Sequence, residues 1–328
     1  MVFESTTPTD GAGSYCCSRD KLHTESADKS KIKQTTSERV QEMSKAARER
    51  SRQSLLADKQ LTLWADALRG APNEIVRSSL FTARNRNQAR ANLKHAIVGM
   101  VGKGEMIYTG EELRQDDETV WFQLIHLARE KGLDTPFQFT PYRLCRLLNW
   151  PLTGQSYDHL EECMTRLQAT SLKMRFQRLG SEISLSMLPI FQAKRRKAGD
   201  GGLWTVQMHG ELVFLFSEFQ YTRVDWQQRL ALPEGLATWL HAYYASHRAP
   251  FDLKFETLAV GAGLMPKILV DPAQMAKHKE RLRDVKKLIV KALSALKGVG
   301  FLTDFNVKRE GLVVVRRAGG GDLRGPIP

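Results

Sequence analysis

The chain has 328 residues, enough for about two domains, and is 42% hydrophobic and 26% charged. This composition fits a globular protein with a substantial core, and it excludes an integral membrane protein or a wholly disordered chain. Lys and Arg number 49 against 36 Asp and Glu, so the formal net charge is +13. A positive excess of this size indicates a polyanionic partner, either nucleic acid or an anionic membrane surface.

Neither the cysteines nor the N-terminus indicates export. Four cysteines in a chain of this length do not make a disulfide framework, and their spacing does not fit a zinc site. The first residues have neither the basic start nor the apolar stretch of a secretory signal. We therefore expect a cytoplasmic protein without a metal or another cofactor.

No motif of a known enzyme class is present in the sequence. The chain lacks a P-loop, a metalloprotease helix motif and a nucleophile elbow. A DNA-nicking enzyme would need a His cluster for a metal near Tyr243 and Tyr244, and the sequence has none there. We therefore predict that the protein is not an enzyme.

The composition changes along the chain predict five segments. The start is rich in Ser and Thr and poor in large apolar residues, which is typical of disorder, although residues 38–58 could form a helix. We predict a disordered N-terminal tail over 1–58, a linker with a basic segment over 59–94, a first domain over 95–216, a second domain over 217–317 and a flexible C-terminus over 318–328.

The first predicted domain begins with a helix over 118–131, after three acidic residues that favour a helix N-terminus. A short strand over 135–139 leads to Thr140, which can cap a helix over 141–148 that has Pro141 at its first position. The pattern then predicts a longer helix over 156–170, a hairpin over 172–187, and one or two strands within 204–216.

The second predicted domain repeats this order. We predict a helix over 233–246, a strand over 249–254, a short helix over 255–260, a long helix over 272–297, and a hairpin from strands 300–305 and 312–315. Helix, strand, helix, helix, hairpin is the winged-helix order. The sequence therefore predicts an α+β protein with tandem winged helix-turn-helix domains, in which each third helix enters the major groove of DNA.

The positive charge is concentrated where these domains would touch DNA. Residues 261–328 hold 14 basic and 6 acidic residues, and a second basic region ends near residue 197. The alternative is that these charges only solvate the surface, and the run at 194–197 could be an ordinary turn. The predicted DNA-binding residues are Tyr157, Arg166, Gln168, Lys173, Arg175, Lys194, Arg195, Arg196, Lys197, Lys277, Lys279, Arg281, Arg283, Lys286, Lys308 and Arg309.

Two of these residues illustrate different roles. If Arg166 reads a base, Arg166→Ala should relax the preference at one position by about 1–3 kcal/mol. If Lys279 contacts a phosphate, Lys279→Ala should weaken binding to every sequence.

A short peptide before the first domain resembles a sliding-clamp-binding motif. Gln60 is followed by Leu61, Leu63 and Trp64, and side chains of this kind can enter an apolar groove in extended conformation. The alternative is a helix face that packs on the domain, because five-residue patterns arise readily by chance.

Several phrases resemble the TrfA family, the replication initiators of broad-host-range plasmids. They are APNEIVRSSLFTARN at 71–85, IYTGEELR at 107–114, LEEC at 160–163, RLQAT at 166–170 and SHRAP at 246–250. The resemblance covers about residues 60–317. Such initiators have a clamp-binding peptide just before the first phrase, where Gln60–Trp64 lies, although Trp64 stands where Phe is usual.

The resemblance implies a function and a set of partners. It implies binding to direct repeats (iterons) in double-stranded DNA at the plasmid origin, opening of an adjacent AT-rich element, and recruitment of the host replicative helicase and the sliding clamp. It further implies contact with the host chromosomal initiator protein, and an inactive homodimer in equilibrium with the monomer. A membrane partner is not expected. The alternative function is a winged-helix transcriptional repressor, which needs neither helicase nor clamp.

Overall fold

The computed structural model describes residues 38–44, 46–47, 50, 61, 64–102, 104–176, 182–194, 202–266 and 274–318. The chain divides into two compact units, Met1–Gln53 and Ser54–Pro328. All described residues of the first unit are helical, in agreement with the helix considered for 38–58. The description below concerns the second unit.

Short elements precede the first long helix, and they are joined to later parts of the chain. They are β1 (Leu68–Pro72), α2 (Asn73–Val76), β2 (Phe81–Thr82), β3 (Asn92–Ile97), β4 (Glu105–Glu111) and β5 (Leu113–Arg114). β1 pairs antiparallel with the distant strand β11 (Tyr221–Asp225), and β2 pairs parallel with β5. Much of the predicted linker over 59–94 is therefore part of the folded unit from Trp64 onward.

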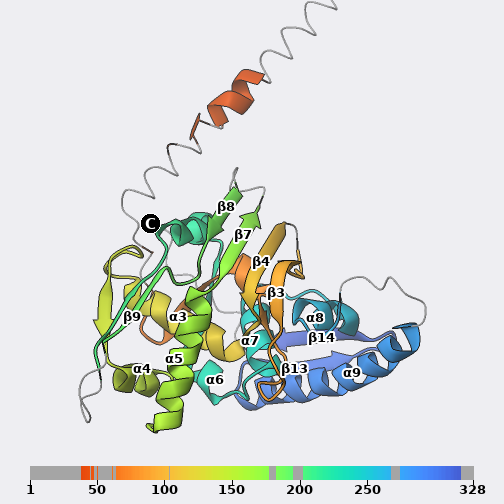
Figure 1. Ribbon diagram of the computed structural model, residues 1–328. Coiled ribbons are helices and arrows are strands. Elements are labelled where there is room, and N and C mark those ends of the chain that lie inside the picture. Colours follow the sequence, from red (N-terminus) through yellow and green to blue (C-terminus); the bar gives the residue numbers. More distant parts are fainter. Residues whose placement is uncertain are drawn as a thin grey trace, which may run out of the picture. The chain divides into compact units, whose positions relative to one another are not determined.

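The first repeat has the predicted order of helix, strand, helix, helix and hairpin, and it contains a further strand over 190–193 that the sequence did not predict. It contains α3 (Gln115–Ala128), β6 (Phe137–Phe139), α4 (Pro141–Leu147), α5 (Gly154–Gln168), β7 (Ser171–Arg175), β8 (Glu182–Leu185), β9 (Ile190–Ala193) and β10 (Trp204–Gln207) (Figure 1). The Thr140 hydroxyl accepts a hydrogen bond from the Arg143 amide at the start of α4, as predicted. Thr153 caps α5 in the same way.

Two hairpins follow α5, and they belong to different sheets. The hairpin β7–β8 pairs with β4, in a four-stranded sheet of order β3-β4-β7-β8. The next hairpin, β9–β10, pairs with β6 in a three-stranded sheet of order β6-β10-β9. Beyond β10, the predicted strand is instead the 3₁₀ helix η2 (Gly210–Phe219), because the continuous apolar run in this segment has no strand alternation.

The second repeat has the same order except that a single hairpin follows its third helix, and the strand order of its sheet corresponds to β6-β10-β9. After α6 (Trp226–Ala231) come α7 (Leu236–Ala245), β12 (Leu253–Lys254), α8 (Phe255–Gly261), α9 (Gln274–Gly298), β13 (Leu302–Val307) and β14 (Leu312–Arg317). The sheet order is β12-β14-β13, so in both repeats the short strand pairs with the second strand of the hairpin. The protein is therefore a mixed α and β fold in which one helix–strand–helix–helix–hairpin unit occurs twice.

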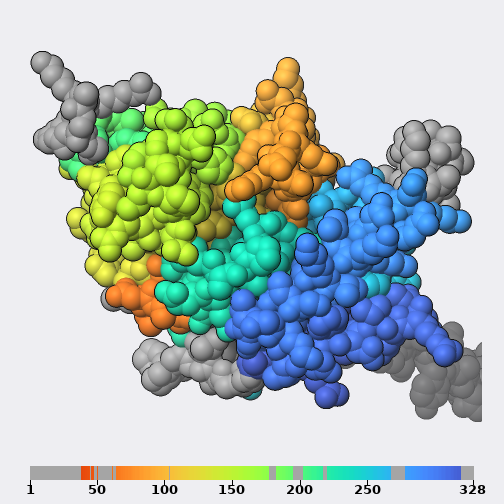
Figure 2. Space-filling model, turned by 90° about the horizontal axis from the view of Figure 1, so that it is seen from below, coloured from red at the N-terminus to blue at the C-terminus, as the bar shows by residue number. Residues whose placement is uncertain are grey.

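Each repeat has its own apolar core. Trp121 and Phe122 of α3 are fully buried in the first core, and Trp239 of α7 and Ile289 of α9 are buried in the second. Figure 2 shows the teal residues that precede and begin the second repeat between the green residues of the first repeat and the blue residues of α9. Of the helices that the structure describes, none is long and apolar enough to cross a membrane.

Candidate nucleic-acid interface

One face of α9 carries a row of unpaired cations. Lys279, Arg283 and Lys286 are spaced i, i+4, i+7, which places them on the same side of the helix, and all three are exposed. None forms an ion pair with any residue that the structure describes. The Lys286 ammonium lies 5.6 Å from the Phe255 ring centroid, at the start of α8. We call Lys279, Arg283 and Lys286 the cationic row.

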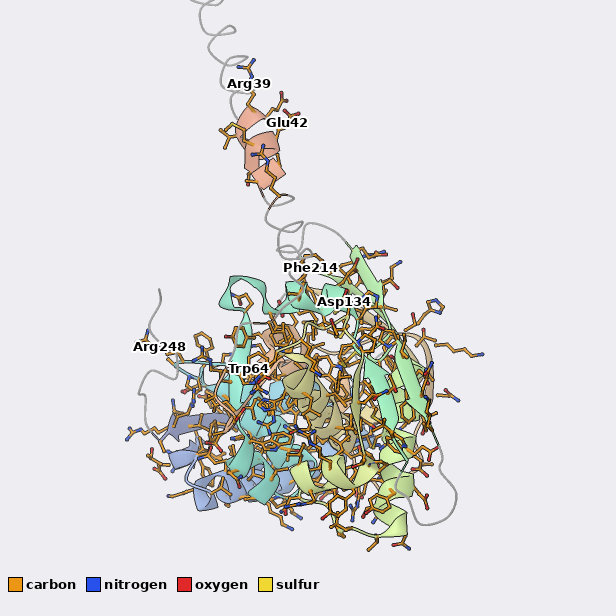
Figure 3. The ribbon with its side chains drawn as sticks, turned by 90° about the vertical axis from the view of Figure 1, so that its left-hand side faces the viewer. Arg39, Glu42, Trp64, Asp134, Phe214 and Arg248 are labelled. Atoms are coloured by element: carbon orange, nitrogen blue, oxygen red, sulfur yellow. The ribbon has the colours of Figure 1, made fainter. Side chains whose placement is uncertain are left out.

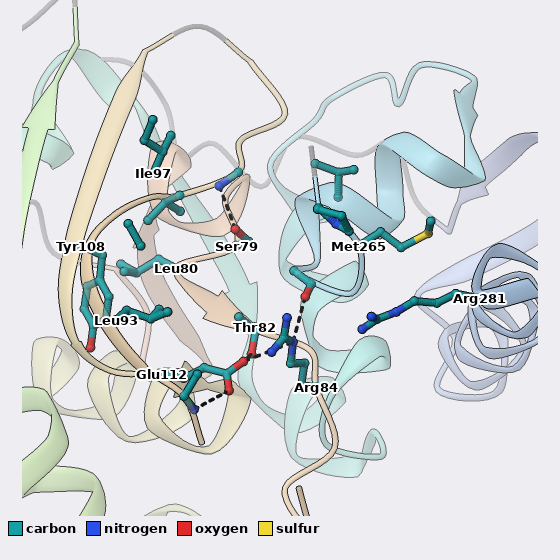
Figure 4. Close-up of a pocket in the computed structure, with 17 residues that line it drawn as sticks. Ser79, Leu80, Thr82, Arg84, Leu93, Ile97, Tyr108, Glu112, Met265 and Arg281 are labelled. Atoms are coloured by element: carbon teal, nitrogen blue, oxygen red, sulfur yellow. Dashed lines mark hydrogen bonds and ion pairs between the residues drawn. The ribbon is translucent and has the colours of Figure 1, made fainter. Parts of the chain in front are cut away.

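Arg281 was predicted to act with these residues, but it lies on another side of the helix. It is two residues from both Lys279 and Arg283, which is a rotation of roughly 200°. Its side chain lines a cavity together with Ser79, Arg84 and Met265, on the side of α9 that faces β3 (Figure 4). Lys277 lies in α9, but its side chain is outside the described part of the structure.

The hairpin after α9 has a tight turn that carries two cations, Lys308 and Arg309. The Lys308 amide donates to Leu312 O at 2.9 Å, and Gly311 supplies the left-handed conformation of the turn, with φ 76°. The Lys308 ammonium is paired with Asp252 at 2.7 Å. Arg309 is exposed and has no ion pair among the described residues. Of the two cations predicted here, Arg309 is therefore the one available to a phosphate.

Arg166 is placed where it cannot read a base. Its exposed fraction is 8%, and its Nε donates to Asp117 Oδ1 at 3.0 Å. Burial opposes its charge, but Asp117 and Asp116 outweigh that effect and raise the pKa of Arg166. The prediction that Arg166 contacts a base is wrong for this conformation, because the guanidinium is directed into the fold.

Arg166 belongs to a buried polar network at the N-terminus of α3. Arg90 reaches Asp116 at 2.6 Å and Asp117 at 2.7 Å, and His159 of α5 lies 3.3 Å from Asp116. The hydrogen bond with Asp116 raises the pKa of His159 despite partial burial. For Asp116, the His159 bond and the charge of Arg90 outweigh burial, so its pKa is lowered. We call Arg90, Asp116, Asp117, His159 and Arg166 the α3 network.

The same region contains the ligand atoms of a possible metal site. Asp116, His159 and Cys163 each offer one atom, and these atoms all lie within 4.8 Å of one another. However, Arg166 donates to the Cys163 sulfur at 3.2 Å, and burial raises the pKa of that thiol well above its usual value. Since two arginines already balance the two aspartates, these groups fit a closed ion-pair network better than a cation site.

The remaining predicted residues of the first repeat fall into three settings. Gln168 at the end of α5 and Lys194 after β9 are exposed, whereas Tyr157 is half-buried against the core. Lys173 and Arg175 lie on β7, outside the three-stranded sheet, and both are ion-paired with Glu182. Arg175 also reaches Glu105 at 3.1 Å. Arg195, Arg196 and Lys197 lie outside the described residues.

Two exposed arginines on α4 were not predicted from the sequence. Arg143 and Arg146 are one turn apart on the helix before α5, and Arg146 lies 5.8 Å from the Tyr142 ring centroid. The sequence pattern contained this signal, because Arg146 falls between the apolar residues Leu144, Cys145 and Leu148, which are buried, and Arg143 directly precedes them.

The segment that resembles a clamp-binding peptide is packed against the first core. Leu61 and Trp64 are 4% and 6% exposed, and the Trp64 indole nitrogen donates to His126 Nδ1 at 3.1 Å. The indole stacks on Phe216 with ring centroids 6.0 Å apart. Figure 3 shows Trp64 inside the folded unit. In this conformation the two side chains are unavailable to a groove on another protein. Gln60 and Leu63 lie outside the described residues.

Comparison with known proteins decides the family. The TrfA protein family model matches residues 24–288, more than half of the chain. The chain belongs to the TrfA family. This confirms the resemblance of residues 71–85 and the other phrases. Plasmid replication initiator protein TrfA of Escherichia coli is 36% identical over 231 residues, which cover 68% of this chain and 60% of that protein.

Solved structures give a weaker likeness to this TrfA-family chain. Two crystal structures contain domains 2 and 3 of RctB, with TM-scores of 0.47 and 0.45 and identities of 13% and 12%. The matches cover 75% and 72% of this chain and 97% and 92% of the RctB chains. TM-scores at this level are too low to assign a shared fold.

Proposed function

We propose that this protein initiates plasmid replication by binding direct repeats in duplex DNA at the plasmid origin through two winged-helix domains. Family membership supports this function over the transcriptional repressor. The repeated element order and the matching sheet topology support the winged-helix assignment, in which α5 and α9 are the recognition helices and the hairpins β9–β10 and β13–β14 are the wings.

The observation that carries the proposal is the cationic row on α9. Its three cations, which have no ion pair with the residues that the structure describes, are spaced i, i+4, i+7 and form a line that can follow a phosphate backbone or enter the major groove. Arg309 adds a further cation on the adjacent hairpin. The exposed face of α5 differs. It carries Asp158 and Glu162 besides Gln155 and Gln168, so we expect its phosphate contacts to come from neighbouring cations such as Arg143 and Lys194.

A DNA-binding titration tests this function. Fluorescence anisotropy would compare a duplex containing the plasmid's origin repeats with a random duplex of equal length, over a series of salt concentrations. Lys279→Ala should weaken binding to both duplexes and reduce the slope of log K against log salt by about 1, because one phosphate contact is lost. The exposed Lys131, which lies outside both hairpins and all helices, provides the control Lys131→Ala. Equal wild-type affinity for the two duplexes would reject sequence-specific binding.

Contacts with other replication proteins are part of the proposal. As the family resemblance implies, we propose recruitment of the host replicative helicase, the host chromosomal initiator protein and the sliding clamp, and an inactive homodimer in equilibrium with the monomer. For clamp binding, Leu61 and Trp64 must leave the first core, because both side chains are buried there.

Clamp capture tests this requirement. Deleting Gln60–Trp64 should abolish capture by immobilised sliding clamp. Trp64→Phe should increase it, because Phe keeps an aromatic anchor but loses the hydrogen bond to His126 that holds the segment in the core. Capture that survives the deletion would reject this segment as the clamp site.

A further inference from the structure

A cavity of about 590 Å³ lies between the sheet β3-β4-β7-β8 and the second repeat (Figure 4). Leu93, Ile97 and Val98, from β3 and the residue after it, line one wall. Val260 and Met265, from α8 and the loop after it, line part of the other. A volume of this size, mostly apolar and bounded by two parts of a fold, is typical of a site for a small organic ligand.

Two arginines reach this cavity from its opposite sides. Arg84 comes from the segment after β2 and Arg281 comes from α9, and in Figure 4 their guanidinium groups point toward each other. The Arg84 Nε donates to Gly263 O at 3.2 Å and lies 3.4 Å from Glu112 Oε1. Among the described residues, the terminal nitrogens of Arg84 and the whole guanidinium of Arg281 have no hydrogen-bond or ion-pair partner.

The charge balance of the cavity favours an anion. Its acidic residue is Glu112, which accepts hydrogen bonds from Arg114 and Thr82; these bonds lower the pKa of Glu112 although burial opposes the shift. Because the Glu112 carboxylate is already shared, it cannot neutralise Arg84 and Arg281 together. An anion between the two guanidinium groups would supply the missing charge, and the planar Arg fork matches phosphate oxygens particularly well.

We propose that this cavity binds a nucleoside phosphate, with the phosphate between Arg84 and Arg281 and the base between the aliphatic walls. The apolar lining, which includes Leu93, Val98 and Val260, suits a flat, largely apolar ring, while the two arginines distinguish a nucleotide from an uncharged nucleoside. The nucleotide can be free in solution or be one unit of a DNA strand. The site does not require the cationic row, which lies on another side of α9.

Isothermal titration calorimetry of the full chain with three probes tests the site. 2′-Deoxyadenosine 5′-monophosphate should bind at least tenfold more tightly than either inorganic phosphate or deoxyadenosine, because only the monophosphate uses both the arginines and the walls. Arg281→Ala and Arg84→Ala should each weaken its binding about tenfold or more. Arg248→Ala is the matched control, since Arg248 is exposed and lies outside the cavity, and it should leave binding unchanged.

Arg281 is the decisive position, because its exposed side chain has no described partner and its loss should not disturb folding, whereas Arg84 also holds Gly263. Displacement of the bound monophosphate by a short single-stranded oligodeoxyadenylate would identify a strand as the source, and failure to displace it would identify the free nucleotide. Absence of monophosphate binding at millimolar concentration, or equal binding by wild type and Arg281→Ala, would overturn the proposal.

Discussion

At the scale of single residues, the setting of a side chain decided its role more than its type did. Arg166 and Lys279 both lie on predicted recognition helices. One is buried against two aspartates, and the other is exposed without a described partner. From the sequence alone the two residues look alike, because both are basic and both lie on a predicted recognition helix. The difference comes from α3, whose acidic first turn lies against α5, whereas the corresponding helix beside α9, α7, has no acidic residue in its first turn.

Arg166→Ala should therefore reduce stability. Removing one partner of a buried pair leaves Asp117 and Asp116 incompletely neutralised, so we expect a loss of about 3–5 kcal/mol in the free energy of unfolding by urea. Lys173→Ala, which removes an exposed partner of Glu182, should cost less than about 1 kcal/mol. If Arg166→Ala kept its stability but lost base discrimination, the original prediction of a base contact would be restored.

The α3 network should also make stability depend on pH through His159. Its folded pKa is raised by Asp116, so its contribution is fully present below the unfolded value of about 6.5 and is lost as the pH rises through the folded value. The wild type should thus lose more unfolding free energy than His159→Asn between pH 6 and alkaline pH. The exposed His95, changed to Asn, is the control. Identical pH profiles for the wild type and His159→Asn would contradict this role.

At the scale of elements, the hairpins fall into two kinds according to the sheet that they join. β9–β10 and β13–β14 extend from three-stranded sheets of the same order, whereas β7–β8 completes a sheet with β3 and β4. The alternation of apolar and polar residues predicts that β7 and β8 form a hairpin. It does not show which other strand the hairpin pairs with. That partner depends on residues 92–111, which are more than 60 positions away along the chain from the end of the hairpin.

The packing of β1 against Trp64 can be tested. A Cβ atom at Gly70 would lie 2.5 Å from Cη2 of Trp64, so Gly70→Ala should force the indole or the strand to move. We expect a loss of about 1–3 kcal/mol in thermal or urea unfolding. Gly154→Ala is the matched control, because nothing lies within 4 Å of its added Cβ, and Ala has the better helix propensity at the start of α5. Equal effects at both positions would argue against the packing of Trp64 under β1.

At the scale of the whole molecule, the two repeats are joined by a buried polar contact. Arg229 of α6 is 1% exposed and pairs with Glu118 of α3 at 3.0 Å. Arg229 also donates to Thr119, and Thr238 of α7 donates to Gln115 of α3. Burial lowers the pKa of Arg229 and raises that of Glu118, and the charge of each group opposes this shift in the other.

This junction predicts a non-additive effect. Arg229→Met alone should destabilise the chain by about 3–5 kcal/mol, because it leaves the Glu118 carboxylate buried without its partner. The double change Arg229→Met with Glu118→Leu should recover most of that loss in urea unfolding, since apolar residues can fill the space. A double variant as unstable as the sum of the two single variants would show that the pair does not act as a unit.

The sequence by itself determined the helix–strand–helix–helix–hairpin order that occurs in both repeats, the cap at Thr140 and the family. These depend on local periodicity, on capping residues and on contiguous phrases. Only the tertiary structure decided which cations are free, which hairpin joins which sheet, and that Trp64 lies in the core. Those outcomes depend on contacts between residues far apart in the chain, such as Arg166 with Asp117 or Trp64 with His126. The pattern of residues along the sequence does not show which distant residue will neutralise a charge or bury an aromatic ring.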